Sequence, residues 1–515
     1  MSVIPLENIT IGGLLRRSAA RYPERPALQQ RGGILSYREM DEAVDLAARR
    51  LMKWGVRKGT HIAIRAEAHQ ETIIAMYALL RIGAVVIMIN TSLIAPEVEN
   101  LLVRTDAEGM LIGDGYKTLI YAADSAPLLG VLPLGIKYIG MDGAQGSFDK
   151  LSDTEPAEEP LLAGAEAAVD PQDIAYILFT SGTSSNPKSV VTTHYSFANS
   201  GIQQASDQQA TCEDKFCVAM PIFHCFCMSV NVLSSCAVGA CLYLPDTRRT
   251  GELLRAVSER RCTVLSSVGA LFHAMLSRSD FEQWDLSSLR TGFIGGSSYP
   301  PEFFKEIEKR FGFTLLSSLG QTEATAGITT ACMDDPLEVR ATTVGHLMSH
   351  IEGRTVDGEL CIRGYNVMKE YYRCPGPTAE AIDEEGWLHT GDMGYFDEAG
   401  NFHLTGRKKE LVIRGGENIS PAEIDALFFG DRRFRYVKTV GVPDPHYGEE
   451  LCLCLEMAEG GVSEVELRDY MKEHLADFKI PRYILIIEGF PVTSTGKVIT
   501  SKLKEIALSM LGLEQ

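Results

Sequence analysis

The sequence predicts an α/β protein: a large N-terminal domain of two layered α/β subdomains and a β-rich subdomain, then a small α+β domain. Two features of the pattern lead to this class. Apolar residues at helical spacing alternate with short apolar runs over most of the chain, which is typical of parallel sheets covered by helices. After about Gly345 the pattern changes to short strands separated by glycine and aspartate. With 515 residues, the chain is also too long for one ordinary hydrophobic core.

The alternation can be followed element by element in the first part of the chain. The expected elements are a helix over 37–55 that stops at Gly55, a strand over 61–66, a helix over 71–83, a buried strand over 84–90, a helix over 251–261, a strand over 262–268, a helix over 300–312 and a strand over 313–320. This order predicts largely parallel sheets.

The second part of the chain has a different composition. Short strands are expected over 358–364, 386–406 and 409–416. The tail is expected to form a small α+β unit from the segments 420–430, 437–445, 450–459, 463–478 and 482–490. The boundary is expected in the basic stretch 406–410, which divides the chain into domains 1–406 and 407–515.

Composition excludes several classes of function. The net charge of −19 makes the chain a poor candidate for binding nucleic acid or an anionic membrane surface. No uncharged run approaches the length of a membrane span, and the N-terminus lacks the pattern of a signal peptide. Cysteines stand in apolar runs, where they behave as small buried hydrophobes, so we expect a cytoplasmic protein. The "FHCFC" stretch, 223–227, lacks a second Cys/His pair at zinc-site spacing, which favours core packing.

The stretch "LFTSGTSSNPKSVVTTH", 178–194, is close to a Walker A phosphate loop. Gly182 is followed by four residues and then by Pro187, Lys188 and Ser189, but the Walker template requires glycine where Pro187 stands. Proline has no N–H and a fixed φ, so it excludes that template. Hydroxyls and backbone N–H groups still fit phosphate oxygens. On this stretch alone, a different phosphate loop and a plain polar turn both remain open.

Five motifs in order resemble one family. They are "TSGTSSNPKS", "SSLGQTEAT", "GWLHTGDMGYFDEAG", "LTGRKKELVIRGGENISPAEI" and "PVTSTGKVIT". The series resembles the adenylate-forming superfamily of acyl-CoA synthetases, adenylation domains and luciferases, and looks most like medium- or long-chain fatty-acid–CoA ligases. The resemblance implies ATP-dependent activation of a carboxylic acid to an acyl-adenylate with release of pyrophosphate. Coenzyme A then takes the acyl group. Charge neutralisation and positioning would drive the first step.

The resemblance also implies roles for single residues. The β- and γ-phosphates would be held by Thr180, Ser181, Gly182, Thr183, Ser184 and Lys188. The α-phosphate would contact Thr322, Mg²⁺ would bind Glu323, and the ribose would contact Asp392 and Arg407. The remaining nucleotide and acyl pocket would include Gly296, Ser297, Leu319 and Gly320. Lys497 would bridge the attacking carboxylate and the α-phosphate.

The C-terminal domain would be a mobile lid. The resemblance implies that it rotates between the two half-reactions about a hinge at Lys409. Gly415 and Gly416 would then allow close approach of the pantetheine arm.

The identity of the acid is less constrained. "PIFHCFC", 221–227, resembles the "P-x-F-H" segment of fatty- and aryl-acid ligases and places His224 between the acyl pocket and the thiol tunnel. It contains no carboxylate for an amino-acid substrate. The other pocket segments, 266–272, 293–300 and 323–329, are small or apolar apart from Glu323. A medium-chain fatty acid is the simplest prediction, with an aryl or arylpropenoic acid as the alternative.

Some positions depart from the family pattern. The family usually has glycine at Ser185 and Ser189, an aromatic residue at Leu319 and a basic residue at Thr500. Two alternative functions therefore remain. One is a standalone adenylation enzyme that loads an acyl or aryl group on a carrier-protein phosphopantetheine. The other is a non-catalytic paralogue that binds nucleotide.

Overall fold

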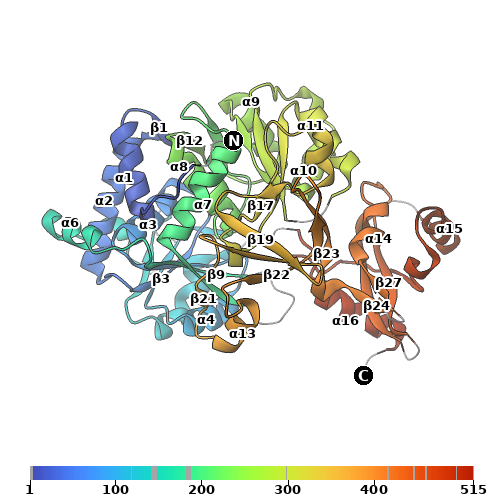
Figure 1. Cartoon of the computed structure of the whole chain (residues 1–515). Helices are drawn as coiled ribbons and strands as arrows, with labels where there is room; N and C mark the ends of the chain where they lie inside the picture. The colour runs from blue at the N-terminus through green and yellow to red at the C-terminus, as the bar shows by residue number, and fades with distance from the viewer. Residues whose placement is uncertain are drawn as a thin grey trace.

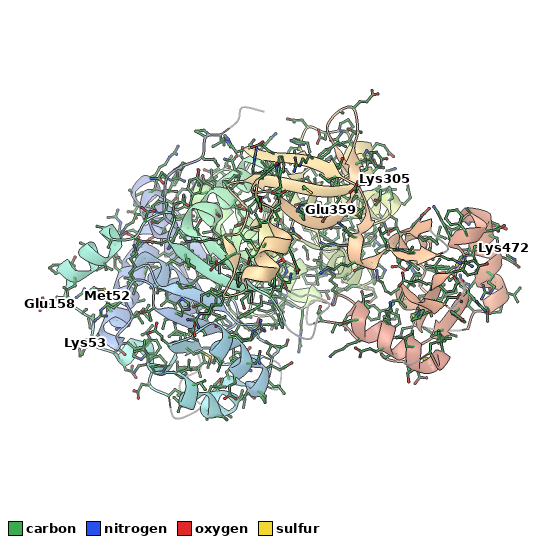
Figure 2. All side chains as sticks on the ribbon, turned by 60° about the horizontal axis from the view of Figure 1, so that its bottom comes forward. Met52, Lys53, Glu158, Lys305, Glu359 and Lys472 are labelled. Carbon is green, nitrogen blue, oxygen red and sulfur yellow. The ribbon has the colours of Figure 1, made fainter. Side chains whose placement is uncertain are left out.

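The computed structural model describes residues 4–116, 119–140, 148–180, 187–296, 299–414, 417–444, 447–458, 461–493 and 496–513. Figure 1 shows a large body that contains the N-terminal and central parts of the chain and a smaller body at the C-terminal end. The expected class, a large α/β domain followed by a small α+β domain, is confirmed. Figure 2 places Lys472 on the smaller body and Met52, Lys53 and Glu158 at the opposite end of the large one.

The first large sheet has seven strands. Their order is β21 (Glu370–Tyr371), β10 (Ser189–Thr193), β9 (Ile174–Phe179), β4 (Val85–Met88), β3 (His61–Arg65), β5 (Gly109–Ile112) and β8 (Gly135–Tyr138). Strands β9, β4, β3, β5 and β8 are parallel, whereas β10 and β21 extend one edge antiparallel. A two-stranded ribbon, β6 (Gly115–Tyr116) and β7 (Leu119–Ile120), lies outside this sheet.

The second large sheet has ten strands. Their order is β18 (His346–Leu347), β17 (Thr329–Thr330), β16 (Thr314–Leu319), β15 (Thr291–Gly295), β13 (Val264–Leu265), β11 (Lys215–Cys217), β12 (Cys241–Tyr243), β1 (Pro26–Gln30) and β2 (Gly33–Ser36), with β14 (Ser267–Val268) also paired with β15. The single strand expected over 262–268 is thus split. Ser266 lies between its two halves and its hydroxyl accepts a hydrogen bond from the Phe293 N–H, which interrupts the ladder.

Helices cover both faces of the sheets. The helices of the large body are α1 (Ile11–Arg21), α2 (Tyr37–Trp54), α3 (Gln70–Arg81), α4 (Ala95–Arg104), α5 (Tyr121–Ser125), α6 (Glu159–Ala167), α7 (His194–Asp207), α8 (Ser234–Val238), α9 (Thr250–Arg260), α10 (Gly269–Leu276), α11 (Pro301–Phe311), α12 (Leu337–Thr342) and α13 (Pro375–Ala381). Successive residues of β3 show the layering. Ile62 and Ile64 join the apolar cluster with α1, α2 and α3, whereas Ala63 joins the cluster with α4 and α5.

Helix α2 illustrates why the sequence could predict these elements. Ser36 caps its N-terminus by accepting from the Glu39 N–H, and Glu39 in turn accepts from the Ser36 N–H, which is a capping box. Gly55 ends the helix with φ +115°, a value that glycine adopts without strain. The helix therefore occupies the predicted range.

A four-stranded antiparallel sheet follows in the chain. It contains β19 (Ile351–Val356), β20 (Glu359–Gly364), β22 (Leu388–Phe396) and β23 (Phe402–Arg407), in that order. This is the predicted β-rich subdomain. Its last strand leads into the smaller body.

The smaller body is built on a five-stranded sheet. The order is β25 (Glu417–Ile419), β24 (Val412–Arg414), β27 (Gly448–Met457) and β26 (Phe434–Asp444), with β28 (Tyr483–Ile486) paired to β27. Its helices are α14 (Pro421–Leu427), α15 (Glu464–His474) and α16 (Thr500–Leu511). Among the residues described, no helix combines the length and the apolar character needed to cross a membrane.

Candidate active site

Strands β9 and β10 position the two ends of the candidate phosphate loop. They pair antiparallel, and the Thr180 N–H donates to the Lys188 carbonyl oxygen at 3.1 Å. Thr180 and Lys188 therefore face each other where the strands end. The four expected phosphate ligands between them, Ser181, Gly182, Thr183 and Ser184, lie outside the described residues, as does Ser185. Ser189 is buried as the first residue of β10.

Tyr371 connects the lysine of this loop to the expected magnesium ligand. The Lys188 ammonium lies 4.3 Å from the centroid of the Tyr371 ring, within the range of a cation–π interaction. The Tyr371 hydroxyl donates to Oε1 of Glu323 at 2.8 Å. Burial, followed by the charge of Glu323, raises the pKa of Tyr371 above its usual value, so the hydroxyl remains a donor. Sequence reasoning missed Tyr371, because no spacing rule links it to residues so distant in the chain.

The loop after β16 presents Thr322 and Glu323. It turns through a short 3-10 helix, Thr322–Ala324. Gly320 is required at its start, because a Cβ there would overlap with the carbonyl oxygen of Ala326. The Met368 N–H donates to the Glu323 carbonyl oxygen at 2.8 Å, which fixes the loop against the neighbouring segment.

Leu319 packs mainly in the apolar core and exposes little of its side chain to a possible ligand. It is 7% exposed and belongs to an apolar cluster that includes Val190 and Ile328. As the last residue of β16, it is paired with Thr329 of β17. Most of its side chain is therefore committed to the core.

Asp392 and Arg407 form a pair on adjacent strands, β22 and β23, where they lie in register. Arg407 Nε is 2.6 Å from Asp392 Oδ1, and Asp392 is 0% exposed. Despite this ion pair, neither carboxylate oxygen has a hydrogen bond of good geometry within the described part of the chain. Burial raises the pKa of Asp392 to about 6, and the nearby Arg407 and Lys497 oppose this effect. A buried carboxylate with unused acceptor capacity is suited to a ligand that brings hydroxyl donors.

Lys497 reaches this site from the smaller body. It closes a tight turn, in which the Thr493 N–H donates to the Lys497 carbonyl oxygen at 2.8 Å. Its pKa is lowered, first because the surrounding protein displaces water and then by the positive charge of Arg407, while Glu410 acts in the opposite sense. The side chain keeps exposed surface, so this desolvation is partial. Burial, and then the charge of Lys497, lower the pKa of His224, a residue of the large body.

His224 is positioned by its own turn. The Phe226 N–H donates to His224 Nδ1 at 3.3 Å, so the neutral ring carries its proton on Nε2. Burial, followed by the charge of Lys497, lowers the pKa of His224 to about 4. The adjacent Cys225 Sγ lies 3.7 Å from Thr322 Oγ1, which joins this turn to the glutamate loop. A neutral, half-buried imidazole is therefore in place at neutral pH.

The ends of β14 and β15 lie against the histidine turn. A Cβ added at Gly295 would come 3.7 Å from Phe226, and one added at Gly296 would come 3.2 Å from Val268. Gly296 also has φ +88°, which favours glycine. Ser297 lies outside the described residues. The side chains nearest to the two glycines are therefore apolar.

The connection between the bodies carries several charges. Lys409 is exposed within the 3-10 helix Lys408–Glu410. Lys408 Nζ donates to Glu359 Oε2 at 2.7 Å, and Figure 2 shows Glu359 on the large body. On the other side, Lys438 Nζ donates to Glu410 Oε2 at 3.1 Å. The predicted pivot thus lies between two ion pairs. Gly415 and Gly416 lie outside the described residues.

The two bodies also meet through aromatic side chains. Phe429, which follows α14 in the smaller body, lies 4.7 Å from Phe303 and 6.0 Å from Tyr299, measured between ring centroids. Sequence reasoning did not identify this contact, since Phe429 stands in an ordinary apolar helix end.

Taken together, the described residues form a site with three cationic groups and two carboxylates. The cations are Lys188, Arg407 and Lys497, and the carboxylates are Glu323 and Asp392. Such a site can bind a polyanion with attached hydroxyl groups and neutralise charge that develops during a reaction. The charged groups come from both bodies.

Comparison with known proteins agrees with this chemistry. Residues 15–372 match the family described as "AMP-binding enzyme", and residues 436–497 match "AMP-binding enzyme C-terminal domain". The putative acyl-CoA synthetase YngI of Bacillus subtilis is 35% identical over a gapped alignment of 539 positions that covers 98% of each chain. The mitochondrial medium-chain acyl-CoA ligase ACSF2 of Rattus norvegicus is 31% identical and covers 97% of this chain and 88% of its own.

Solved structures share the fold. The anthranilate CoA ligase AuaEII in complex with anthranoyl-AMP superposes with a TM-score of 0.87 at 21% identity, covering 99% of each chain. The o-succinylbenzoate CoA synthetase MenE of Bacillus subtilis, bound to its acyl-adenylate intermediate, superposes with a TM-score of 0.82 at 25% identity. This alignment covers 95% of the present chain and 97% of MenE.

Proposed function

The chain belongs to the AMP-binding enzyme family, and we propose that it activates a carboxylic acid with ATP and transfers the acyl group to coenzyme A. One observation carries the proposal. The charge of Lys497 in the smaller body acts on Asp392 and His224 of the large body, and Arg407 acts on Lys497, which supports placing the cation needed for adenylation beside the proposed nucleotide and acyl sites.

The first half-reaction needs groups that hold ATP. We propose that Lys188 and the loop that begins at Thr180 bind the β- and γ-phosphates, and that Thr322 donates to the α-phosphate. Asp392 would accept hydrogen bonds from the ribose hydroxyls, which supplies the partners that its buried oxygens lack. Arg407 would hold Asp392 in its ionised form.

Glu323 fits a magnesium ion. Its Oε1 accepts from Tyr371, so the second carboxylate oxygen remains for a hard cation that prefers oxygen ligands. When bound, Mg²⁺ would neutralise phosphate charge. Tyr371 would orient the carboxylate and, through its ring, the Lys188 ammonium.

Lys497 would serve the attack itself. The substrate carboxylate and the α-phosphate are both anions, and an ammonium between them lowers their repulsion while they approach. The lysine is long and has three donors, so it can contact both groups. Pyrophosphate leaves as the carboxylate oxygen bonds to the α-phosphorus.

The second half-reaction would require Lys497 to leave. We propose that the C-terminal domain rotates as a unit about the hinge at Lys409, while β23 and its last residue, Arg407, stay with the large body. The sheet changes support this boundary, because β23 ends at Arg407 and the five-stranded sheet begins at Val412. The thiol of coenzyme A would then attack the acyl carbonyl near His224, and AMP would leave.

We further propose a medium-chain fatty acid as the substrate. Gly295 lies against Phe226 of the histidine turn and Gly296 lies against Val268, and the segment 221–227 contains no carboxylate to pair an amino group. The ACSF2 relatives are medium-chain acyl-CoA ligases by name, which supports the same class. An aryl acid is the competing substrate.

The test is ATP–pyrophosphate exchange with octanoate, palmitate, acetate and benzoate, followed by thioester formation with coenzyme A. The proposal predicts the fastest exchange with octanoate and a thioester product. Exchange with benzoate alone would contradict the medium-chain assignment, and the absence of exchange with every acid would contradict the proposed activity.

A further inference from the structure

A second cluster of reactive side chains lies away from the adenylation site, beside strands β17 and β18. It consists of Cys332, Asp335 and His346, whose candidate ligand atoms all lie within 4.8 Å of one another. His346 is held by backbone pairing of β18 with Thr330 of β17. Cys332 follows β17 two residues later, so the strand pair brings the thiol and the imidazole together. Figure 1 shows β17 in the upper middle of the large body.

The turn after Cys332 supplies the carboxylate. The Cys332 N–H donates to Asp335 Oδ2 at 2.6 Å, and the Asp335 N–H donates to the Cys332 carbonyl oxygen at 3.2 Å. These two bonds fix the carboxylate next to the thiol and leave its other oxygen for a further ligand. All three side chains are half-buried, so an ion could enter from solvent.

The spacing of the thiol and the imidazole suits a tetrahedral metal. Cys332 Sγ lies 3.5 Å from His346 Nε2. Zinc binds sulfur at about 2.3 Å and nitrogen at about 2.0–2.1 Å, and a tetrahedral angle between these bonds separates the two atoms by about 3.5 Å. Cys332 Sγ also lies 3.8 Å from His346 Nδ1, so the imidazole must rotate to direct one ring nitrogen at the ion.

The surroundings favour a cation. Asp207, at the end of α7, is 7% exposed, and its Oδ2 has no hydrogen-bond partner within the part of the chain that the structure describes. The end of α7 lies against the turn over 332–335, because Gln209 Nε2 donates to Asp334 Oδ2 at 3.3 Å. Asp207 is thus a buried acid, near this turn, that a positive ion would stabilise.

A second trio provides an internal comparison. Glu359, Cys361 and His389 also have ligand atoms within 4.8 Å, and Cys361 Sγ lies 3.5 Å from His389 Nδ1. There, however, the Lys408 ammonium already binds Glu359 at 2.7 Å. A metal ion bound to this second trio would have to displace the Lys408 ammonium or lie beside its positive charge, so the trio is a poor metal site.

We propose that Cys332, Asp335 and His346 bind a divalent transition metal, zinc first, with Asp207 as a nearby acid that strengthens binding. The thiol loses its proton to solvent on binding and coordinates as a thiolate, while the imidazole binds in its neutral form. The three ligands leave a fourth position for water. The ion would connect β17 to β18 and to the turn over 332–335. No role in the acyl transfer is required of it.

The test uses the full chain, stripped with a chelator and titrated with Co²⁺ as a spectroscopic probe. Tetrahedral binding with a thiolate ligand predicts a sulfur-to-cobalt charge-transfer band that saturates at one equivalent and disappears when Zn²⁺ is added. Cys332→Ser should remove the band. His346→Gln changes a half-buried side chain, so it tests the site even if the serine variant folds poorly, and it should also abolish tight binding.

Two further variants test whether the cobalt band arises at this site or at another cysteine of the protein. Cys361→Ser should keep the band, because it alters the trio that Lys408 occupies. Asp207→Asn should keep the band but weaken Co²⁺ binding by about tenfold. The absence of a band in the wild-type protein, its survival in Cys332→Ser, or its loss in Cys361→Ser would overturn the proposal. An unchanged affinity in Asp207→Asn would overturn the part assigned to that residue.

Discussion

Replacing Tyr371 by phenylalanine removes one hydroxyl group from the proposed phosphate site. The ring stays under Lys188, where the ammonium lies 4.3 Å from the centroid, but the 2.8 Å hydrogen bond to Glu323 is lost. Replacement by leucine removes both interactions. The pair of variants therefore separates the orientation of the carboxylate from the orientation of the lysine.

The expected magnitudes follow from these two contacts. A hydrogen bond to a charged group contributes about 2 kcal/mol, which is about 30-fold in an equilibrium or rate ratio. A cation–π contact at a half-buried lysine adds about 1 kcal/mol, which is about fivefold. We expect kcat/KM for ATP to fall about 30-fold in Tyr371→Phe and about 150-fold in Tyr371→Leu. The loss in the phenylalanine variant should be accompanied by a higher Mg²⁺ requirement.

The assay is ATP–pyrophosphate exchange at varied ATP and Mg²⁺ concentrations. The matched control is Tyr372→Phe. Tyr372 is the next residue in the chain, and its hydroxyl donates a 2.7 Å hydrogen bond to the Asp106 carboxylate, away from the site, which the phenylalanine variant loses. The control should keep wild-type exchange. Wild-type exchange in Tyr371→Phe, or equal losses in Tyr371→Phe and Tyr371→Leu, would refute the reasoning.

The remaining predictions concern the ribose pair, the glutamate loop and the contact between the bodies. Because burial raises the pKa of Asp392 to about 6, the KM for ATP should rise as pH falls below about 6, and Asp392→Asn should show a high KM without this rise. The folded state binds that proton more tightly than the unfolded chain, so the free energy of unfolding should rise as pH falls from about 6 toward the ordinary carboxyl pKa. The check compares the pH dependence of the free energy of unfolding in the wild type with that in Asp392→Asn. Gly320→Ala would place a Cβ against the Ala326 carbonyl oxygen and should lower the free energy of unfolding by about 2 kcal/mol. Gly376→Ala is the control: its Cβ would have open space around it, so the free energy of unfolding should not change. Phe429→Ala removes the aromatic contact between the bodies and should slow adenylation by about fivefold without slowing thioester formation from supplied acyl-adenylate; the exposed Phe478→Ala serves as its control.

Local sequence signals were sufficient for many elements of the fold. Helix α2 could be predicted because Ser36, Glu39 and Gly55 determine its ends through interactions within a few residues. The strand over 262–268 was predicted as one element, but Ser266 divides it by accepting a hydrogen bond from a strand distant in sequence. Such a contact leaves no local signal.

The candidate site likewise contains residues that the sequence could predict and residues that it could not. Motif resemblance assigned roles to Lys188, Glu323, Asp392 and Lys497, and these roles stay predictions. The structure links Lys188 to Glu323 through Tyr371 and pairs Asp392 with Arg407. Tyr371 was not found, because its role depends on β10 pairing with β21, which brings residues distant in the chain into contact. Leu319 was assigned to the nucleotide and acyl pocket, which stays a prediction, and most of its side chain packs in the core around β16 and β17.

The central claim is that Lys497 serves adenylation and then leaves the site. The direct measurement compares Lys497→Ala with the wild type in both half-reactions, using ATP–pyrophosphate exchange and thioester formation from synthetic acyl-adenylate. The exposed Lys502→Ala on α16 is the control. We predict that Lys497→Ala loses exchange and retains thioester formation. Equal loss of both half-reactions, or retention of exchange, would contradict the account.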